Sequence, residues 1–141
     1  MEPRVFIDTT IFIYSFEYPS SNSAKIIDLL NKEELEAITS DRVLKEVTKY
    51  FEKFHSITLA RIFRKYILGA CLLIYKDNAL DKIADLKGKI KDKDIEQVAI
   101  TKKYGIKYLI AFDRDFKSFE EYITPKKFLQ IFGKEASITE F

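Results

Sequence analysis

The stretch "DIEQVAITKKYGIKYLIAFDRDF", residues 94–116, contains a helix pattern, a stop signal and a strand pattern in one block. Its first part predicts a helix, and Gly105 stands where a left-handed residue commonly closes a helix. Residues 108–112 form a short apolar run that predicts a strand ending at Asp113. A helix that leads directly into such a strand is typical of an α/β unit.

The same alternation continues toward both ends of the chain. Further strands are predicted at 4–7, 36–39 and 122–124, together with a buried strand at 71–75. Helices are predicted at 10–18, across "SSNSAKIIDLLNK", after Ser40 or Asp41 with Phe54 on its apolar face, at 57–69 with Ile62 on its apolar face, at 78–89 and at 125–132. The sequence therefore predicts a single α/β domain over residues 1–141, built around a parallel sheet.

Composition narrows the class of protein. The chain is 47% apolar and 33% charged, as in globular proteins, and its net charge of +2 is too small to indicate a nucleic-acid partner by itself. The single cysteine, Cys71, excludes an internal disulfide and is predicted to lie in the core. No apolar run approaches the roughly 18 residues of a membrane span. We expect a soluble cytoplasmic protein.

Four acids are predicted to share one edge of the sheet. Asp8 and Asp113 directly follow strands, Glu46 lies in the second turn of a helix, and Asp94 lies at the start of another helix. In right-handed βαβ units the carboxyl ends of strands and the amino ends of helices meet at the same edge, where ligands bind. Each acid alone has a plainer interpretation, as a helix cap, a solvated residue or a turn residue. Their convergence favours a site.

Neighbouring carboxylates need a counter-charge. Two of them about 5 Å apart repel by roughly 3 kcal/mol at an effective dielectric constant near 20. Oxygen ligands without His or Cys suit Mg²⁺ or Mn²⁺, and such ions promote phosphodiester hydrolysis. Asp92 and Asp115 are alternatives to Asp94 and Asp113. The single histidine, His55, is predicted to be an exposed polar residue, so catalysis through it is disfavoured.

Four blocks of the sequence resemble the PIN domain, a nuclease fold found in VapC-type toxins and in RNA-processing enzymes. They are "FIDTTIFIY", "SDRVLKEV", the 94–116 block and "ITPKKFL", and they occur in the family's order. The resemblance implies a three-layer α/β/α fold around a parallel sheet of four or five strands. It also implies RNA cleavage that depends on Mg²⁺ or Mn²⁺.

The resemblance extends to individual acids. Asp8 and Asp94 match the family's principal metal ligands, Glu46 matches the acid on the helix after the second strand, and Asp113 matches the fourth acid. Asp115 is expected to support these ligands. All four matching acids are therefore candidate catalytic and metal-binding residues.

Of two positions where the family usually has a polar side chain near the acids, this sequence keeps one and lacks the other. Thr9 or Thr10 matches the polar position where a hydroxyl orients a carboxylate or phosphate. Ala111 stands two residues before Asp113, where the family usually has Thr or Ser. We expect this change to weaken metal binding rather than abolish it.

Basic residues near the acidic edge are candidate RNA contacts, although a solvated surface is an equally good interpretation of each one. The resemblance also implies a homodimer and an antitoxin protein as partner. A non-catalytic module that binds RNA or protein, and a housekeeping RNA-processing nuclease, are the alternatives. The candidate RNA contacts are Arg42, Lys45, Lys49, Lys91, Lys93 and Arg114.

Overall fold

Each predicted apolar run becomes a strand in the computed structural model, which describes residues 2–141. All neighbouring strands pair in parallel, in the order β3-β2-β1-β4-β5. The predicted α/β fold with a parallel sheet is confirmed, and the sheet has five strands. The strands are β1 (Arg4–Ile7), β2 (Glu36–Ser40), β3 (Cys71–Ile74), β4 (Tyr108–Ile110) and β5 (Tyr122–Ile123).

Short polar side chains start several of the helices. Ser21, Ser40, Ser56 and Thr124 each accept a hydrogen bond from the backbone amide three residues further on, as N-cap residues do. The helices are α1 (Thr9–Glu17), α2 (Asn22–Asn31), α3 (Asp41–Phe54), α4 (Ile57–Ala70), α5 (Leu80–Leu86), α6 (Asp92–Lys103) and α7 (Pro125–Ile131), with short 3-10 helices η1 (Lys76–Ala79) and η2 (Arg114–Phe116).

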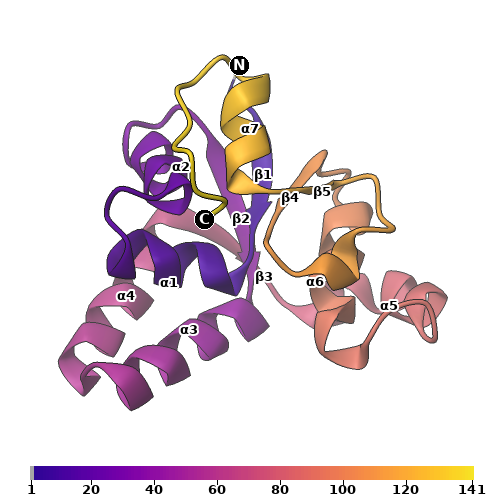
Figure 1. Ribbon diagram of the computed structural model, residues 1–141. Coiled ribbons are helices and arrows are strands. Elements are labelled where there is room, and N and C mark those ends of the chain that lie inside the picture. The colour runs from indigo at the N-terminus through magenta and orange to yellow at the C-terminus, as the bar shows by residue number, and fades with distance from the viewer. Residues whose placement is uncertain (1) are drawn as a thin grey trace.

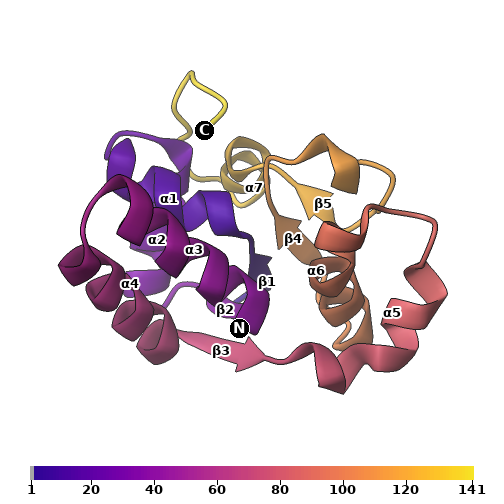
Figure 2. The same ribbon diagram turned by 90° about the horizontal axis from the view of Figure 1, so that it is seen from below.

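The helices cover both faces of the sheet and make three layers. Figure 1 shows α1, α2, α3, α4 and α7 on one side of the strands and α5 and α6 on the other, and the view from below in Figure 2 agrees. This division follows from the strand order, because right-handed crossovers from β1 to β3 run one way along the sheet and the crossover to β4 runs back. The central strand β1 is the most enclosed, with Val5, Phe6 and Ile7 fully buried.

The carboxyl end of β1 lies beside the end of β4. Ile7 is in register with Ile110, and the Asp8 amide donates a hydrogen bond to the Ile110 carbonyl at 3.1 Å. The order of the strands reverses at this point, and crevices at such positions are where open α/β sheets bind ligands. The fold therefore brings the chain after β1 and the chain after β4 to one place.

The prediction of a buried strand at 71–75 is wrong about burial. β3 is an edge strand that pairs only with β2, and Leu72 is 56% exposed. Cys71 is partly buried against the core rather than enclosed in it, although burial still raises the pKa of its thiol to about 12. A thiol of that pKa is not a reactive nucleophile at neutral pH.

Two predicted core residues of the α3–α4 hairpin are exposed. Phe54, the last residue of α3, is 59% exposed, and Ile62 on α4 is 57% exposed. The hairpin helices pack mainly on each other, so part of each apolar stripe faces away from the sheet. His55 is exposed as predicted, and its Nε2 lies 2.8 Å from the Glu17 Oε2.

The helix predicted over 78–89 is shorter and divided. It consists of η1 followed by α5, which ends at Leu86, and Gly88 then takes a φ of +82° in a turn. This left-handed conformation suits glycine and stops the helix before Lys89. Within residues 2–141, none of the helices is both long and apolar enough to cross a membrane.

Candidate active site

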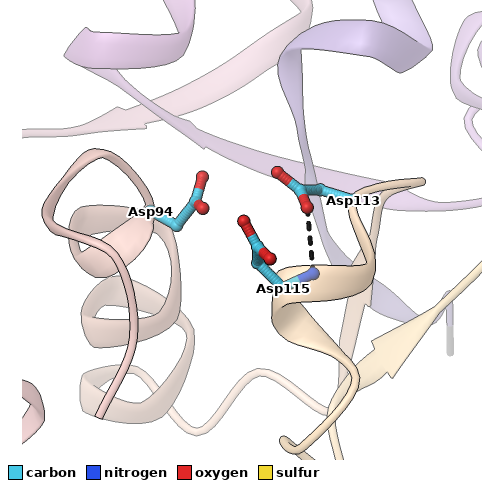
Figure 3. Close-up of side chains that lie close together, drawn as sticks. All are labelled: Asp94, Asp113 and Asp115. Carbon is cyan, nitrogen blue, oxygen red and sulfur yellow. Dashed lines mark hydrogen bonds between the residues drawn. The ribbon is translucent and has the colours of Figure 1, made fainter.

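Three aspartates converge at the edge of the sheet. Asp94 comes from the first turn of α6, Asp113 follows β4, and Asp115 lies in η2. One carboxylate oxygen from each lies within 4.8 Å of the others. Figure 3 shows the three carboxyl groups turned toward a common space. We call this group the α6–η2 cluster.

A tight turn fixes Asp113. Its Oδ1 accepts a hydrogen bond from the Asp115 backbone amide at 2.9 Å, which is the dashed line in Figure 3. This local bond places both carboxylates on the same turn. The methyl side chain of the fully buried Ala111 offers no hydroxyl to Asp113, and the turn supplies an anchor in its place.

Asp94 has an incomplete set of partners. The residue is only 5% exposed, and its Oδ2 has no hydrogen-bond partner among residues 2–141. Burial raises the pKa of the Asp94 carboxyl, and the nearby Asp113 raises it further. A buried carboxylate oxygen without a donor is costly unless a cation satisfies it. The cluster offers oxygen donors alone, so the donor set fits Mg²⁺ or Mn²⁺.

Two lysines at the start of α6 reach the cluster. Lys91 Nζ lies 3.1 Å from Asp115 Oδ2, and Lys93 Nζ lies 3.7 Å from Asp113 Oδ2. Both lysine side chains are more than half exposed. Ion pairs with such exposed partners are weak and exchangeable. Asp113 and Asp115 are thus neutralised by exposed side chains rather than by a buried base.

Asp8 borders the cluster from the strand side. It occupies the N-cap position of α1, but its side chain makes no capping hydrogen bond within the described chain, so the plain cap interpretation fails. The residue is 6% exposed, and Gln97 Nε2 donates to its Oδ1 at 3.4 Å. Burial raises the pKa of Asp8 to about 7, with smaller increases from Glu46 and Asp94, while the Thr9 amide and Gln97 lower it.

Glu46 lies on α3 next to this carboxyl. Thr9 Oγ1 donates to Glu46 Oε1 at 3.0 Å, and Arg42 Nε lies 3.9 Å from the same oxygen. The Thr10 hydroxyl makes no such bond within residues 2–141, so the orienting hydroxyl is that of Thr9. Asp8 and Glu46 stand outside the α6–η2 cluster, and we call them the β1–α3 pair.

The sequence matches the family model described as "PIN domain" over residues 5–122. The chain belongs to the PIN domain family. No curated protein matches this PIN domain.

Solved structures share its fold. A toxin–antitoxin complex from Klebsiella pneumoniae has a chain 20% identical, with a TM-score of 0.68 over 86% of this chain and 97% of that chain. VapC20 of Mycobacterium tuberculosis, a sarcin–ricin loop cleaving toxin, is 18% identical, with a TM-score of 0.60 over 81% and 93% of the two chains. VapBC2 from Rickettsia felis, bound to a DNA fragment of its promoter, has a chain 16% identical, with a TM-score of 0.63 over 86% and 96%.

Sequence reasoning missed two residues of this PIN domain. Gln97 is 2% exposed, and Glu96, 9% exposed, accepts the Arg42 backbone amide on its Oε2 at 3.2 Å. The pair therefore ties α6 to both the strand and the α3 sides of the site. A signal was present, because Gln97 follows Asp94 by three residues and so shares its helical face.

The candidate RNA contacts are divided between two sides of the PIN domain. Lys45 pairs with Asp41 at 2.8 Å on α3, where Lys49 is exposed. Arg114 is exposed beside Asp113. These side chains surround the acidic edge without entering the α6–η2 cluster, unlike Lys91 and Lys93.

Proposed function

We propose that this PIN domain is an endoribonuclease that depends on Mg²⁺ or Mn²⁺, and that it is the toxin of a toxin–antitoxin pair. One observation carries the proposal. Asp94, which has a buried carboxylate oxygen without a donor, lies beside two further carboxylates at the ligand-binding edge of a PIN fold. A divalent cation satisfies all three groups at once, and RNA phosphates are further oxygen ligands for the same ion.

The acids would have two different roles, cation binding and proton transfer. Asp94, Asp113 and Asp115 would hold the cation, and Asp8 would border it from the buried side. A divalent ion held there would supply Lewis-acid chemistry, polarising a phosphoryl oxygen and making water more acidic. Glu46 is exposed and oriented by the Thr9 hydroxyl, which suits it to accept a proton from the attacking water.

Two of the similar structures support the choice of substrate and partner. The VapC20 structure is that of a toxin that cleaves the sarcin–ricin loop, an RNA element. The structure from Klebsiella pneumoniae is a toxin–antitoxin complex. We therefore infer RNA as the substrate and an antitoxin protein as the partner, and the homodimer implied by the resemblance stays a prediction.

An RNA cleavage assay tests the proposal. The protein is purified under denaturing conditions and refolded, so that no bound inhibitor remains, and is incubated with structured and unstructured RNAs in Mn²⁺ or in EDTA. We expect cleavage in Mn²⁺, none in EDTA, and none by the Asp8→Asn/Asp94→Asn double variant. Equal cleavage by the double variant would refute the assignment of these acids.

Two other outcomes identify the alternatives. Complete inactivity of the refolded protein across varied RNAs, with RNA still bound, would identify a non-catalytic binding module. Active protein with no inhibitory protein encoded beside its gene would identify a processing nuclease. An adjacent gene whose product blocks cleavage would identify a toxin.

A further inference from the structure

A row of lysines leads into α6. Every second residue of "KGKIKDK" is lysine, giving Lys87, Lys89, Lys91 and Lys93, and all four are exposed. We call these four residues the lysine strip. Gly88 makes a turn within the strip, Lys91 has an extended backbone at the N-cap of α6, and Lys93 lies in the first turn of that helix. Asp92 is the only acid between Lys87 and Lys93.

The two halves of the strip have different partners. Lys91 and Lys93 form ion pairs with Asp115 and Asp113, two members of the α6–η2 cluster. Lys87 and Lys89 form no ion pair with any part of the chain from residue 2 to residue 141. Half of the strip is therefore free to meet an external anion, and half is held by the chain's own carboxylates.

A divalent cation and the inner lysines compete for the same oxygens. Lys91 and Lys93 reach Oδ2 of Asp115 and Oδ2 of Asp113, and these carboxylates belong to the group that fits the cation. A lysine is a single charge on a flexible stem, and an exposed lysine–aspartate pair is weak. A doubly charged ion bound by these carboxylates would displace both ammonium groups and leave them without a partner beside the cluster.

We propose that the lysine strip is a phosphate track for single-stranded RNA, and that its inner half becomes available only when a divalent cation occupies the α6–η2 cluster. The inference rests on the proposed function and names how that site acquires its substrate. Lysines bind phosphates as point charges, so the track carries no base specificity. Cation binding and RNA binding then strengthen each other by the same factor.

The salt dependence of RNA binding tests the track. Binding of a fluorescein-labelled oligouridine is followed by anisotropy on ice, in Mn²⁺ and in EDTA, with the integrity of the RNA checked on a gel. Each lysine contact with single-stranded RNA adds about 0.7 to the slope of log affinity against log salt. We therefore expect the wild-type slope to be steeper in Mn²⁺ by about 1.4, the share of two lysines.

Paired variants separate the halves of the strip. In Lys91→Gln/Lys93→Gln the salt slope should no longer become steeper in Mn²⁺. In Lys87→Gln/Lys89→Gln it should still become steeper in Mn²⁺, but the slope should be shallower than that of the wild type both in Mn²⁺ and in EDTA. Lys32→Gln/Lys134→Gln is the control, because these lysines pair with Asp28 and Glu34 away from the site and should leave the slope unchanged.

Calorimetric titration with Mn²⁺ gives a readout independent of RNA. Lys91→Gln/Lys93→Gln should bind Mn²⁺ about two- to fivefold more tightly, because no ion pair has to be broken. The inference would be overturned if the salt slope of RNA binding still became steeper in Mn²⁺ in this variant. It would also be overturned if the wild type bound Mn²⁺ without any change in that slope. Either result would leave the proposed nuclease standing. A wild type that binds no Mn²⁺ and cleaves no RNA would overturn both.

Discussion

The carboxylates of Asp113 and Asp115 and the carboxylate of Asp8 border one site but have different kinds of partner. Asp113 and Asp115 are paired with exposed lysines, whereas Asp8 is buried against the uncharged amide of Gln97. A lysine neutralises a carboxylate and can leave it, while an amide orients a carboxylate without neutralising it. The pKa of Asp8 consequently rises to about 7. One region of the site is thus suited to exchange cations, and the other responds to protons.

The cation-exchanging region gives the largest expected effect. Asp94→Asn removes the negative charge of the most buried carboxylate of the α6–η2 cluster, and RNA cleavage in Mn²⁺ should fall by more than about 100-fold, beyond the cost of losing an outer-shell partner. Asp92→Asn is the matched control, since this exposed residue lies two positions earlier on α6 and should change the rate by less than about twofold. Equal losses in the two variants would remove the distinction between a ligand and a helix-terminal charge.

The proton-responsive region should appear in metal-free stability. The carboxyl of Asp8 has a pKa of about 7 when the protein is folded, compared with the ordinary aspartate value of 3.8 in the unfolded chain. Between these values the folded state holds a proton that the unfolded state has released, so this group lowers stability as pH rises from about 4 to 7. Asp8→Asn stays neutral and escapes the loss, which amounts to about 4 kcal/mol at most.

Urea unfolding in EDTA at several pH values measures this difference. We expect Asp8→Asn to match the wild type near pH 4 and to exceed its stability by a few kcal/mol above pH 7. Identical pH profiles for the two proteins would show that Asp8 is not held in an uncompensated environment, and the contrast with the lysine-paired aspartates would disappear.

The link between the two regions is Gln97, and its loss should have an intermediate effect. Gln97→Met keeps the shape of the side chain but removes the donor to Asp8, so Mn²⁺ affinity should fall by about tenfold. A cleavage defect at limiting Mn²⁺ should disappear at saturating Mn²⁺. Thr101→Val on the same helix is the control, because within residues 2–141 the Thr101 hydroxyl bonds to the Gln97 backbone carbonyl and to no side chain of the site. Unchanged Mn²⁺ affinity in Gln97→Met would mean that Asp8 needs no such support.

The smallest effect concerns Glu46. Thr9→Val removes the hydroxyl that orients this carboxylate, and kcat should fall by about three- to fivefold, the share of one hydrogen bond. Thr10→Val removes the adjacent hydroxyl and should leave kcat within about twofold of wild type. The two variants compared in steady-state kinetics test whether the first threonine, and not the second, serves the β1–α3 pair.

Connectivity explains what the sequence could predict. Alternating strands and helices were enough to bring Asp8, Asp94 and Asp113 to one edge, because the ends of parallel strands and of crossover helices must meet there. The sequence offered two threonines as candidates for the hydroxyl that orients a carboxylate, and only the structure identifies Thr9 as the partner of Glu46. The two hydroxyls cannot both reach Glu46, because successive side chains of a helix point about 100° apart.

Lateral packing explains what the sequence could not predict. The apolar patterns of 71–75 and of the α3–α4 hairpin do not reveal that β3 is an edge strand or that Phe54 lies at a helix end. Likewise, the convergence of Asp115 with Asp94 depends on how η2 is set against α6. Gln97 carries no charge, so a search of the sequence for acidic residues does not find this hydrogen-bond partner of Asp8.

The central claim is that the α6–η2 cluster holds a divalent cation. Anomalous diffraction at the manganese edge, from crystals soaked in Mn²⁺ near pH 7.5, tests it directly. We expect a peak within coordination distance of Asp94, Asp113 and Asp115, with Lys91 and Lys93 moved away from their carboxylates. A well-occupied Mn²⁺ elsewhere, or lysines still seated on empty aspartates at saturating Mn²⁺, would contradict it.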